Sequence, residues 1–391
     1  MWKTHETQFW LRGERPEKPV CYDESAGLWN VYGYPEVQAV VADPKTFASD
    51  VYRITPDHRR PKVDGKYVSM DGMITLMDPP QHTKLRKLIS GAFAPKVMAR
   101  LEPKIATLTN ELFDQAGNDR MDFVDALAFP LPSIVVCDML GIPKEDSDLF
   151  QKWGAGMFER NNQPSQLEQS EERDREVEKH ADSLLQFRAY VAEHAAERRE
   201  NPREDLLTAL VESPLTNDQV VNFASALLIA GHLNTFMMLS NTVFCLDQFP
   251  DWQDRVRADR SIIPAVIEES MRFLTPFAAL SRATTCEVKL GGEKIPADQM
   301  LLVWVAAANR DPRVFANPDT FDPGRDHSAH MALGWGIHFC LGAFLARLEG
   351  RVVLNILLDR YPQLRTIPDD PPVFLPAALL TGFRKLPLSL R

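Results

Sequence analysis

Cys340 lies in a glycine-rich run, Leu333-Gly334-Trp335-Gly336-Ile337-His338-Phe339-Cys340-Leu341-Gly342, whose residue types could bind a metal through sulfur. Its two glycines before the cysteine let the backbone turn tightly and let a flat ligand approach closely. The pattern predicts a helix that begins at the cysteine, and the positive end of a helix dipole lowers the pKa of a nearby thiol. A metal can then bind Cys340 as thiolate. The alternatives are a buried, inert thiol, or a zinc or iron site of His338 and Cys340, which lacks further ligands at suitable spacing.

The run resembles the haem-ligand loop of the cytochromes P450, whose pattern is Phe, Gly, any residue, Gly, any residue, His or Arg, any residue, Cys, any residue, Gly. Every fixed position matches except the first, where Leu333 replaces Phe and keeps an apolar residue under the haem. The resemblance implies a haem b whose iron is held by Cys340 as axial thiolate. It also implies that Leu333, Gly334 and Gly336 lie against the cofactor, with backbone N–H groups near the sulfur.

Four basic residues match the family's contacts to the haem propionates: His82, Arg86, Arg282 and His338. The first two lie four residues apart, on one face of a helix that Asp78-Pro79-Pro80 is expected to open, with Asp78 as its cap. Haem carries two carboxylates, which accept charge-assisted hydrogen bonds from Arg and His. Without the resemblance, a solvated basic face beside Lys84 and Lys87 explains His82 and Arg86 equally well.

Glu269 and Arg272 lie three residues apart and are neighbours on a helix, where such pairs are common surface features. In the family that the run resembles, a Glu-x-x-Arg pair on a late helix joins a third Arg and stabilises the core beside the haem. Arg325 matches that third position. The resemblance implies a structural triad that does not act on substrate.

The long apolar helix expected near residue 230 departs from the family pattern, which is Ala or Gly, Gly, any residue, an acid and Thr. Ala230 and Gly231 match, and Gly231 is expected to leave room for oxygen above the iron. Leu233 and Asn234 stand where the family has its acid and its Thr. Thr235 comes one residue late, which turns it away by about 100° on a straight helix. The usual proton relay is therefore absent, or it is supplied by water, by substrate or by a local bulge.

The resemblance implies an enzyme that activates O₂ with two electrons, which come from NAD(P)H through a ferredoxin and a ferredoxin reductase. We expect hydroxylation of a small organic or short-peptide substrate in secondary metabolism. Oxidative coupling of aromatic rings in a natural product is the alternative that Leu233 and Asn234 favour. A haem-binding helper or sensor without turnover is a third hypothesis, which the intact cysteine loop opposes.

The catalytic residues expected on the long helix are Gly231, Asn234 and Thr235, with Ala230 beside the haem. By resemblance, apolar residues form the walls of the substrate pocket: Leu227, Leu233, Ala278, Leu280 and Leu380. Ordinary core packing is the alternative for these residues. Lys84, Lys87 and nearby arginines are expected to receive an acidic ferredoxin.

The elements that position these residues are mostly helices. A capping box, Thr216-Asn217-Asp218-Gln219, predicts the start of the long helix, which extends to Gln248. Pro264 and Pro276 bound the helix of the Glu-x-x-Arg pair. Short strands with a Gly291-Gly292 turn are expected between residues 283 and 305, and charged helices between 159 and 205. This is a mainly α fold with small β-sheets (α+β), the cytochrome P450 fold with a long central helix over the haem.

Composition limits the possible domain number, partners and location of the protein. The chain has 391 residues, 45 % of them hydrophobic, and shows no linker or repeat, so we expect one domain over 1–391. A formal net charge of -10 without a basic tract argues against nucleic acid as a partner. Five scattered cysteines without C-x-x-C indicate reduced thiols and a cytoplasmic location. The polar N-terminus predicts no signal peptide or anchor, and the apolar stretch 223–246 is expected to be a core helix rather than a membrane span.

Overall fold

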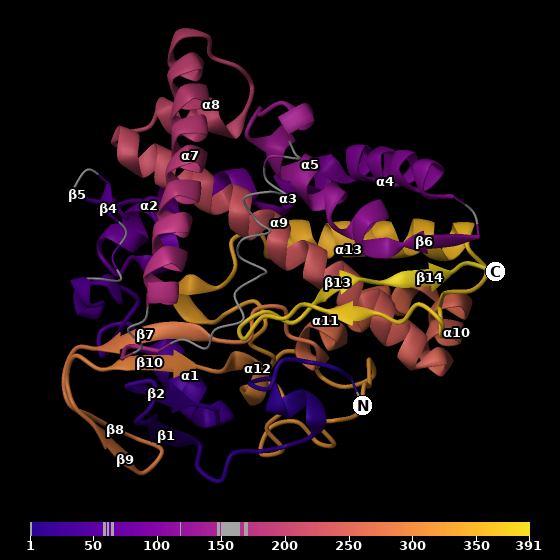
Figure 1. The fold of residues 1–391 in the computed structure, drawn as a ribbon. Coiled ribbons are helices and arrows are strands. Elements are labelled where there is room, and N and C mark those ends of the chain that lie inside the picture. Colours follow the sequence, from indigo (N-terminus) through magenta and orange to yellow (C-terminus); the bar gives the residue numbers. More distant parts are fainter. Residues whose placement is uncertain are drawn as a thin grey trace.

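A 32-residue helix, α9 (Asn217–Gln248), crosses the centre of the protein, and helices α5, α7 and α11 pack against it (Figure 1). It begins at the predicted capping box: the Thr216 hydroxyl accepts from the backbone N–H of Gln219, whose side chain accepts from the N–H of Thr216. Among the described residues, α9 is the one helix that is long and apolar enough to cross a membrane. Since 67 % of its most apolar window is buried inside the protein, the prediction of a core helix is confirmed.

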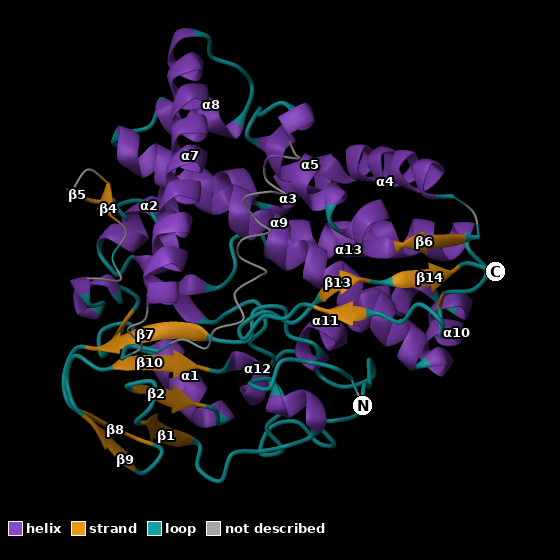
Figure 2. Cartoon of the chain, viewed as in Figure 1, coloured by secondary structure: helices purple, strands orange, loops and turns teal. Residues whose placement is uncertain are grey.

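The computed structural model describes residues 2–57, 60, 62–63, 66–117, 119–146, 149, 165–167 and 171–391. It confirms a mainly helical fold with small sheets (Figure 2). The other helices are α1 (Tyr34–Ala42), α2 (Gln81–Ile89), α3 (Pro95–Met98), α4 (Glu102–Ala116), α5 (Pro130–Met139), α7 (Glu171–Glu200), α8 (Leu206–Val211), α10 (Pro250–Ala258), α11 (Ile263–Phe273), α12 (Val305–Ala308) and α13 (Ala343–Arg360). Much of the charged segment 159–205 is the long helix α7, whereas residues 150–164 and 168–170 lie outside the described part.

The largest sheet has five strands in the order β1-β2-β10-β7-β3 and lies beside the helical part (Figure 2). Its strands are β1 (Val20–Asp23), β2 (Leu28–Val31), β3 (Phe47–Ala48), β7 (Leu280–Thr284) and β10 (Met300–Val303). The small sheets contain β4 (Lys62–Val63) with β5 (Lys66–Tyr67), β8 (Val288–Leu290) with β9 (Glu293–Ile295), β12 (Val373–Phe374) with β13 (Phe383–Lys385), and β6 (Arg120–Asp122) with β14 (Pro387–Ser389) and β11 (Arg365–Thr366). The predicted Gly291-Gly292 turn joins β8 to β9, and both glycines have positive φ.

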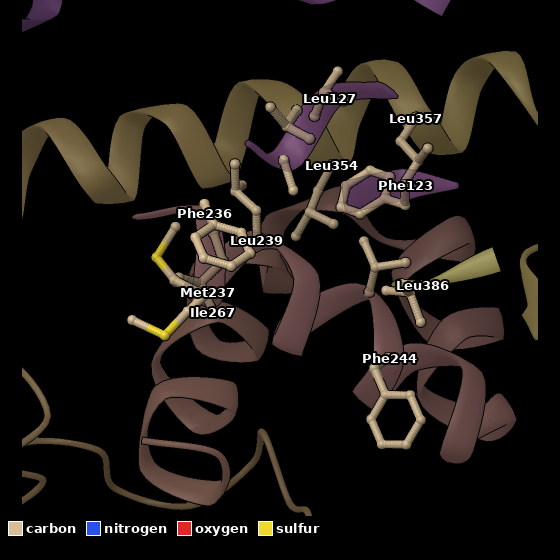
Figure 3. Close-up of a cluster of buried hydrophobic side chains, with 14 of the residues drawn as sticks. Phe123, Leu127, Phe236, Met237, Leu239, Phe244, Ile267, Leu354, Leu357 and Leu386 are labelled. Atoms are coloured by element: carbon tan, nitrogen blue, oxygen red, sulfur yellow. The ribbon is translucent and has the colours of Figure 1, made fainter. Parts of the chain in front are cut away.

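The core between the helices is formed by side chains from segments far apart in the sequence. Figure 3 shows Phe236, Met237, Leu239 and Phe244 of α9 close to Ile267 of α11, Leu354 and Leu357 of α13, and Phe123, Leu127 and Leu386. All are less than 4 % exposed. Because α9, α11 and α13 share this core, the helix that follows the cysteine loop is fixed relative to the centre of α9.

Two predicted helix starts were wrong in detail. Helix α2 begins at Gln81 with Pro80 at its N-cap position, and no side chain caps it. The Asp78 carboxylate instead accepts from the backbone N–H groups of Ser49 and Asp50, at 2.9–3.0 Å. The last long helix begins at Ala343 rather than at Cys340. Gly342 is its N-cap, so Cys340 lies in the turn before the helix.

Candidate functional site

The loop before Cys340 is a tight turn held by glycine conformations. Gly334 and Gly336 have φ angles of 75° and 63°, in the left-handed region that favours glycine. The N–H of Cys340 donates to the carbonyl of Leu333 at 2.8 Å, which closes the turn. A Cβ at position 334 would lie 3.2 Å from the carbonyl oxygen of His338. The predicted requirement for glycine at both positions is therefore explained by backbone geometry.

The thiol of Cys340 does not have the depressed pKa that the sequence led us to expect. Burial raises its pKa, and this effect outweighs the backbone N–H of Gly342 and the positive charges of Arg86 and Arg347, which lower it. The helix starts too late for Cys340 to occupy its first turn, so the expected dipole effect is weaker. The Gly342 N–H nevertheless supplies the donor to sulfur that a thiolate ligand requires.

The four basic residues named from the sequence come together beside this loop. The rings of His82 and His338 lie 4.3 Å apart between centroids. Arg86 donates to the carbonyl of Phe339 at 2.6 Å, and Arg282 is 6 % exposed. Helix α2, strand β7 and the cysteine loop therefore deliver their basic side chains to one place.

The described residues do not satisfy all the buried donors of this cluster. Both ring nitrogens of the buried His82 have no hydrogen-bond partner within the part of the chain that the structure describes. Burial and the positive charges of Arg282, His82 and Arg86 lower the pKa of His338 to about 3. Burial and Arg86 likewise lower the pKa of His82. A ligand that carries carboxylates would satisfy these donors, so the residues present fit a haem.

Ser49 is a member of the cluster that the sequence did not reveal. Its side chain is fully buried, and its hydroxyl lies 2.9 Å from the Nε2 of His338. The position follows from β3, which pairs with β7 and brings residue 49 beside Arg282. No local pattern around Ser49 indicated a role, because the contact joins segments 289 residues apart.

One face of α9 is less buried than the rest of the helix. The residues on it include Ala226, Leu227, Ala230, Gly231 and Asn234, which recur at spacings of three and four. Ala230 is exposed although it belongs to the central helix of the protein. This face is therefore open to a ligand, and it carries the residues that the sequence placed above the haem.

The departure from the acid–Thr pattern is visible on this face. The Asn234 amide nitrogen donates to the carbonyl of Ala230 at 3.3 Å, which keeps the side chain along the open face. Thr235 is 5 % exposed, and its hydroxyl donates to the carbonyl of Gly231 at 3.0 Å. Leu233 is 4 % exposed. Of these three residues, only Asn234 remains available to a ligand.

Gly231 has a packing role that the sequence did not predict. A Cβ at this position would lie 2.8 Å from Cγ2 of Val136 on α5. The neighbouring His232 ring is buried against Phe129, with centroids 4.7 Å apart. Glycine is thus needed so that α5 can approach α9 closely.

The predicted pocket walls are placed unevenly. Leu227 lies on the open face of α9, and Leu380 forms an isolated bridge with Phe277. Ala278 is fully buried in a cluster that contains Trp304, and Leu280 packs against the core of the large sheet. Phe277, which the sequence did not single out, is 37 % exposed next to Leu380. Core packing therefore accounts for Ala278, whereas Leu280 is only partly buried.

Glu269, Arg272 and Arg325 form a buried ion cluster. Arg272 donates two hydrogen bonds to the Glu269 carboxylate, both at 2.8 Å, and Arg325 donates to it at 3.1 Å. Glu269 and Arg272 are fully buried. Arg272 also donates to the carbonyls of Asn309, Pro318 and Thr320. The cluster thereby fixes the irregular segment that leads to the cysteine loop.

Comparison with known proteins identifies relatives along the whole chain. The sequence model of the cytochrome P450 family matches residues 7–381. The erythromycin C-12 hydroxylase of Saccharopolyspora erythraea is 38 % identical over 97 % of this chain and 93 % of that protein. The cyclomarin C epoxidase CymV of Salinispora arenicola is 36 % identical over 96 % and 95 %.

Solved structures give the same result. The crystal structure of the hydroxylase HmtN has a TM-score of 0.88 and 46 % sequence identity, and covers 100 % of this chain and 98 % of that chain. A second structure of HmtN, described as a post-tailoring hydroxylase involved in himastatin biosynthesis, has a TM-score of 0.86 and 45 % identity over the same shares.

Proposed function

Because the chain belongs to the cytochrome P450 family and is a haem-thiolate monooxygenase, we propose that Cys340 holds the haem iron and that the enzyme hydroxylates a small organic substrate. The proposal is supported by the glycine turn at Cys340 with the buried basic cluster beside it, and by the open face of α9. The family match over residues 7–381 supports one domain across the chain.

The chain's own residues would divide the work of holding the cofactor. Cys340 would supply the axial ligand, while Leu333, Gly334 and Gly336 would lie against the ring. His82, Arg86, Arg282 and His338 would donate to the propionates, and Ala230 would face the ring from α9. When bound, haem iron with a thiolate ligand supplies the oxygen chemistry, since the thiolate favours cleavage of the O–O bond.

Asn234 would be the polar group nearest the substrate. Its amide nitrogen is engaged with Ala230, so its amide oxygen is left as an acceptor. An acceptor of this kind orients a substrate hydroxyl or N–H, and a substrate hydroxyl or a water would then deliver the protons that Leu233 cannot. Gly231 and Thr235 would act indirectly, by setting the distance to α5 and the local shape of α9.

Oxygen insertion is favoured over oxidative coupling because the relatives are named hydroxylases and an epoxidase. One oxygen atom of O₂ would enter the substrate and the other would leave as water, with two electrons and two protons consumed. Oxidative coupling remains the second candidate, since Leu233 and Asn234 replace the acid–Thr pair. A haem-binding helper is disfavoured by the intact turn at Cys340.

The substrate would be a secondary metabolite. Relatives named for erythromycin, cyclomarin C and himastatin biosynthesis support this class. Leu227, Leu280 and Leu380 would contribute apolar contacts, with the buried Leu233 and Ala278 behind them. Bacterial enzymes of this kind need redox partners. We propose a ferredoxin and its NAD(P)H-dependent reductase, received near Lys84 and Lys87, and a cytoplasmic location.

The assignment of Cys340 is tested by the absorption spectrum of the reduced, carbon monoxide-bound protein after haem reconstitution. We expect a thiolate-type Soret band in the wild type and its loss in Cys340→Ala. Cys286→Ala is the matched control, because Cys286 is exposed and distant in sequence. A wild type without a Soret band, or a Cys340→Ala variant with an unchanged one, contradicts the proposal.

The reaction is tested by titrating the ferric protein with aromatic peptides, macrolactones, terpenes and fatty acids, followed by mass analysis of turnover products. A spin-state shift with aliphatic ligands and a product that gains one oxygen support hydroxylation. A shift with aromatic peptides alone and a product that loses two hydrogens support coupling.

A further inference from the structure

A second charged cluster, not used in the function proposed above, lies beside the cysteine loop. Arg347 of α13 donates from Nε and Nη2 to the two carboxylate oxygens of Glu268 on α11, at 2.6 and 2.7 Å. His330 completes it, with its Nε2 at 2.9 Å from the Glu268 carboxylate. We call these three residues the Glu268 network. Two-point contact of this kind fixes the direction of the guanidinium as well as its distance.

The network is largely shielded from solvent. The side chains of His330, Glu268 and Arg347 are 4 %, 18 % and 38 % exposed. Burial alone would raise the pKa of Glu268, but the hydrogen bonds from Arg347 and His330 outweigh it and lower that pKa to about 2. Glu268 therefore carries a full negative charge across the neutral range, opposite the positive charge of Arg347.

The same network faces the turn that carries Cys340. A cavity of about 280 Å³ is lined both by the Glu268 network and by Gly334, Gly336 and Phe339 of the cysteine loop. Phe339 precedes Cys340 directly in the chain, and Arg347 follows it by seven residues, at the start of α13. The Glu268–Arg347 pair therefore shares a cavity with the backbone beside the sulfur.

We propose that the Glu268–Arg347 pair sets the reduction potential of the haem, with Arg347 favouring the added electron and Glu268 limiting that effect. The proposal rests on Cys340 as the iron ligand. Reduction adds one electron to the iron and its thiolate, so a nearby positive charge favours reduction and a nearby negative charge opposes it. Glu268 and Arg347 are positioning residues here, since neither touches the iron.

The test is spectroelectrochemistry of the haem-loaded protein at low salt. Glu268→Gln removes the negative charge and is expected to shift the potential in the positive direction. Arg347→Gln removes the positive charge and is expected to shift it in the negative direction. The double variant removes both charges and is expected to return towards the wild-type value.

Matched controls separate charge from structure. Arg347→Lys keeps the charge and is expected to stay nearer the wild-type potential than Arg347→Gln does. Arg351 and Glu102 form a comparable pair, 2.7 Å apart, one turn further along α13. Since neither Arg351 nor Glu102 lines the cavity beside the cysteine loop, Glu102→Gln is expected to leave the potential unchanged.

Two outcomes overturn the inference. The first is that the reduction potential does not change, and the second is that it shifts in the same direction in Glu268→Gln and Arg347→Gln. In either case the Glu268 network would have a purely structural role. If Glu268→Gln does not retain haem, the inference is tested by the reduction potentials of Arg347→Lys and Arg347→Gln alone. A wild type that lacks the thiolate-type spectrum would instead contradict the proposed function, so the two failures are distinguishable.

Discussion

Glu349 is a buried acid without a counter-charge. It lies on α13, is fully buried, and neither carboxylate oxygen has a hydrogen-bond partner among the described residues. Burial raises its pKa to about 8. The native state therefore holds Glu349 protonated at neutral pH, whereas the unfolded chain ionises it at its ordinary pKa.

This difference predicts how stability depends on pH. Because the pKa is raised in the native state, the contribution of Glu349 to stability is greatest below the ordinary Glu pKa and falls as pH rises towards about 8. Glu349→Gln cannot ionise, so its advantage over the wild type should grow by ~1.4 kcal/mol per pH unit between about pH 5 and pH 7. Apparent Tm values of both proteins at several pH values test this. An equal difference at every pH would show that Glu349 is charged or solvated in the native state.

Single residues were predictable from the sequence where a local pattern carried them. The glycine turn before Cys340 and the Glu269–Arg272 pair follow from short spacings, and the structure shows the geometry of both. Ser49 and Glu268 were not predictable, since their partners come from distant segments. The pKa of Cys340 was misjudged because burial, which a sequence pattern does not show, outweighs the helix dipole.

At the scale of elements, the segment 68–73 is fastened to the first turns of α9. The amide of Asn222 donates to the carbonyls of Ser69 and Asp71, at 3.1 and 2.6 Å. Gln219 donates to the Asp71 carboxylate, and Arg188 of α7 reaches the Ser69 carbonyl at 3.3 Å. The segment thus contacts both α7 and α9, which no sequence pattern predicted.

We expect Asn222→Ala to loosen this segment without unfolding α9. Two part-buried hydrogen bonds are lost, which corresponds to roughly 1–3 kcal/mol of local stability. Hydrogen–deuterium exchange should become faster in residues 68–73, while the centre of α9 stays protected. Asn217→Ala is the control, since Asn217 lies on the same helix and its side chain accepts from Arg199 instead. Unchanged exchange in 68–73 would mean that Gln219 and Arg188 suffice to hold it.

Most elements were predictable because their boundaries carry signals. The capping box at Thr216 and the proline at 264 mark helix starts that the structure confirms. The start of α13 was placed three residues early, because the turn Cys340-Leu341-Gly342 has no capping side chain to reveal it. The cap of α2 was wrong for a tertiary reason, since the Asp78 carboxylate accepts from the backbone N–H groups of Ser49 and Asp50, which follow β3.

At the scale of the whole molecule, the N-terminal segment is tied to a loop near the C-terminus. Gln8 is 1 % exposed, and its amide donates to the carbonyls of Ala377 and Leu380, at 3.2 and 2.7 Å. Thr7 donates to the carbonyl of Ala378 at 3.0 Å. These bonds support the loop that carries Leu380, so the two ends of the chain jointly shape that side of the candidate pocket.

Gln8→Ala should therefore lower stability although it lies near the start of the chain. Two buried carbonyls lose their donor, which costs about 1–3 kcal/mol. A fall in apparent Tm measures this, and Gln248→Ala at an exposed position serves as the control. A Tm equal to that of the wild type would show that water replaces the amide at both carbonyls.

The attachment of Gln8 to residues 377–380 has a consequence for biosynthesis. On the ribosome, Gln8 is made 369 residues before Ala377 and 372 residues before Leu380. Strand β6 likewise waits for β14 (Pro387–Ser389). The nascent chain therefore cannot complete this side of the protein until these late segments have left the ribosome. Chains truncated before residue 377 should lack this side, and we expect cellular proteases to remove them.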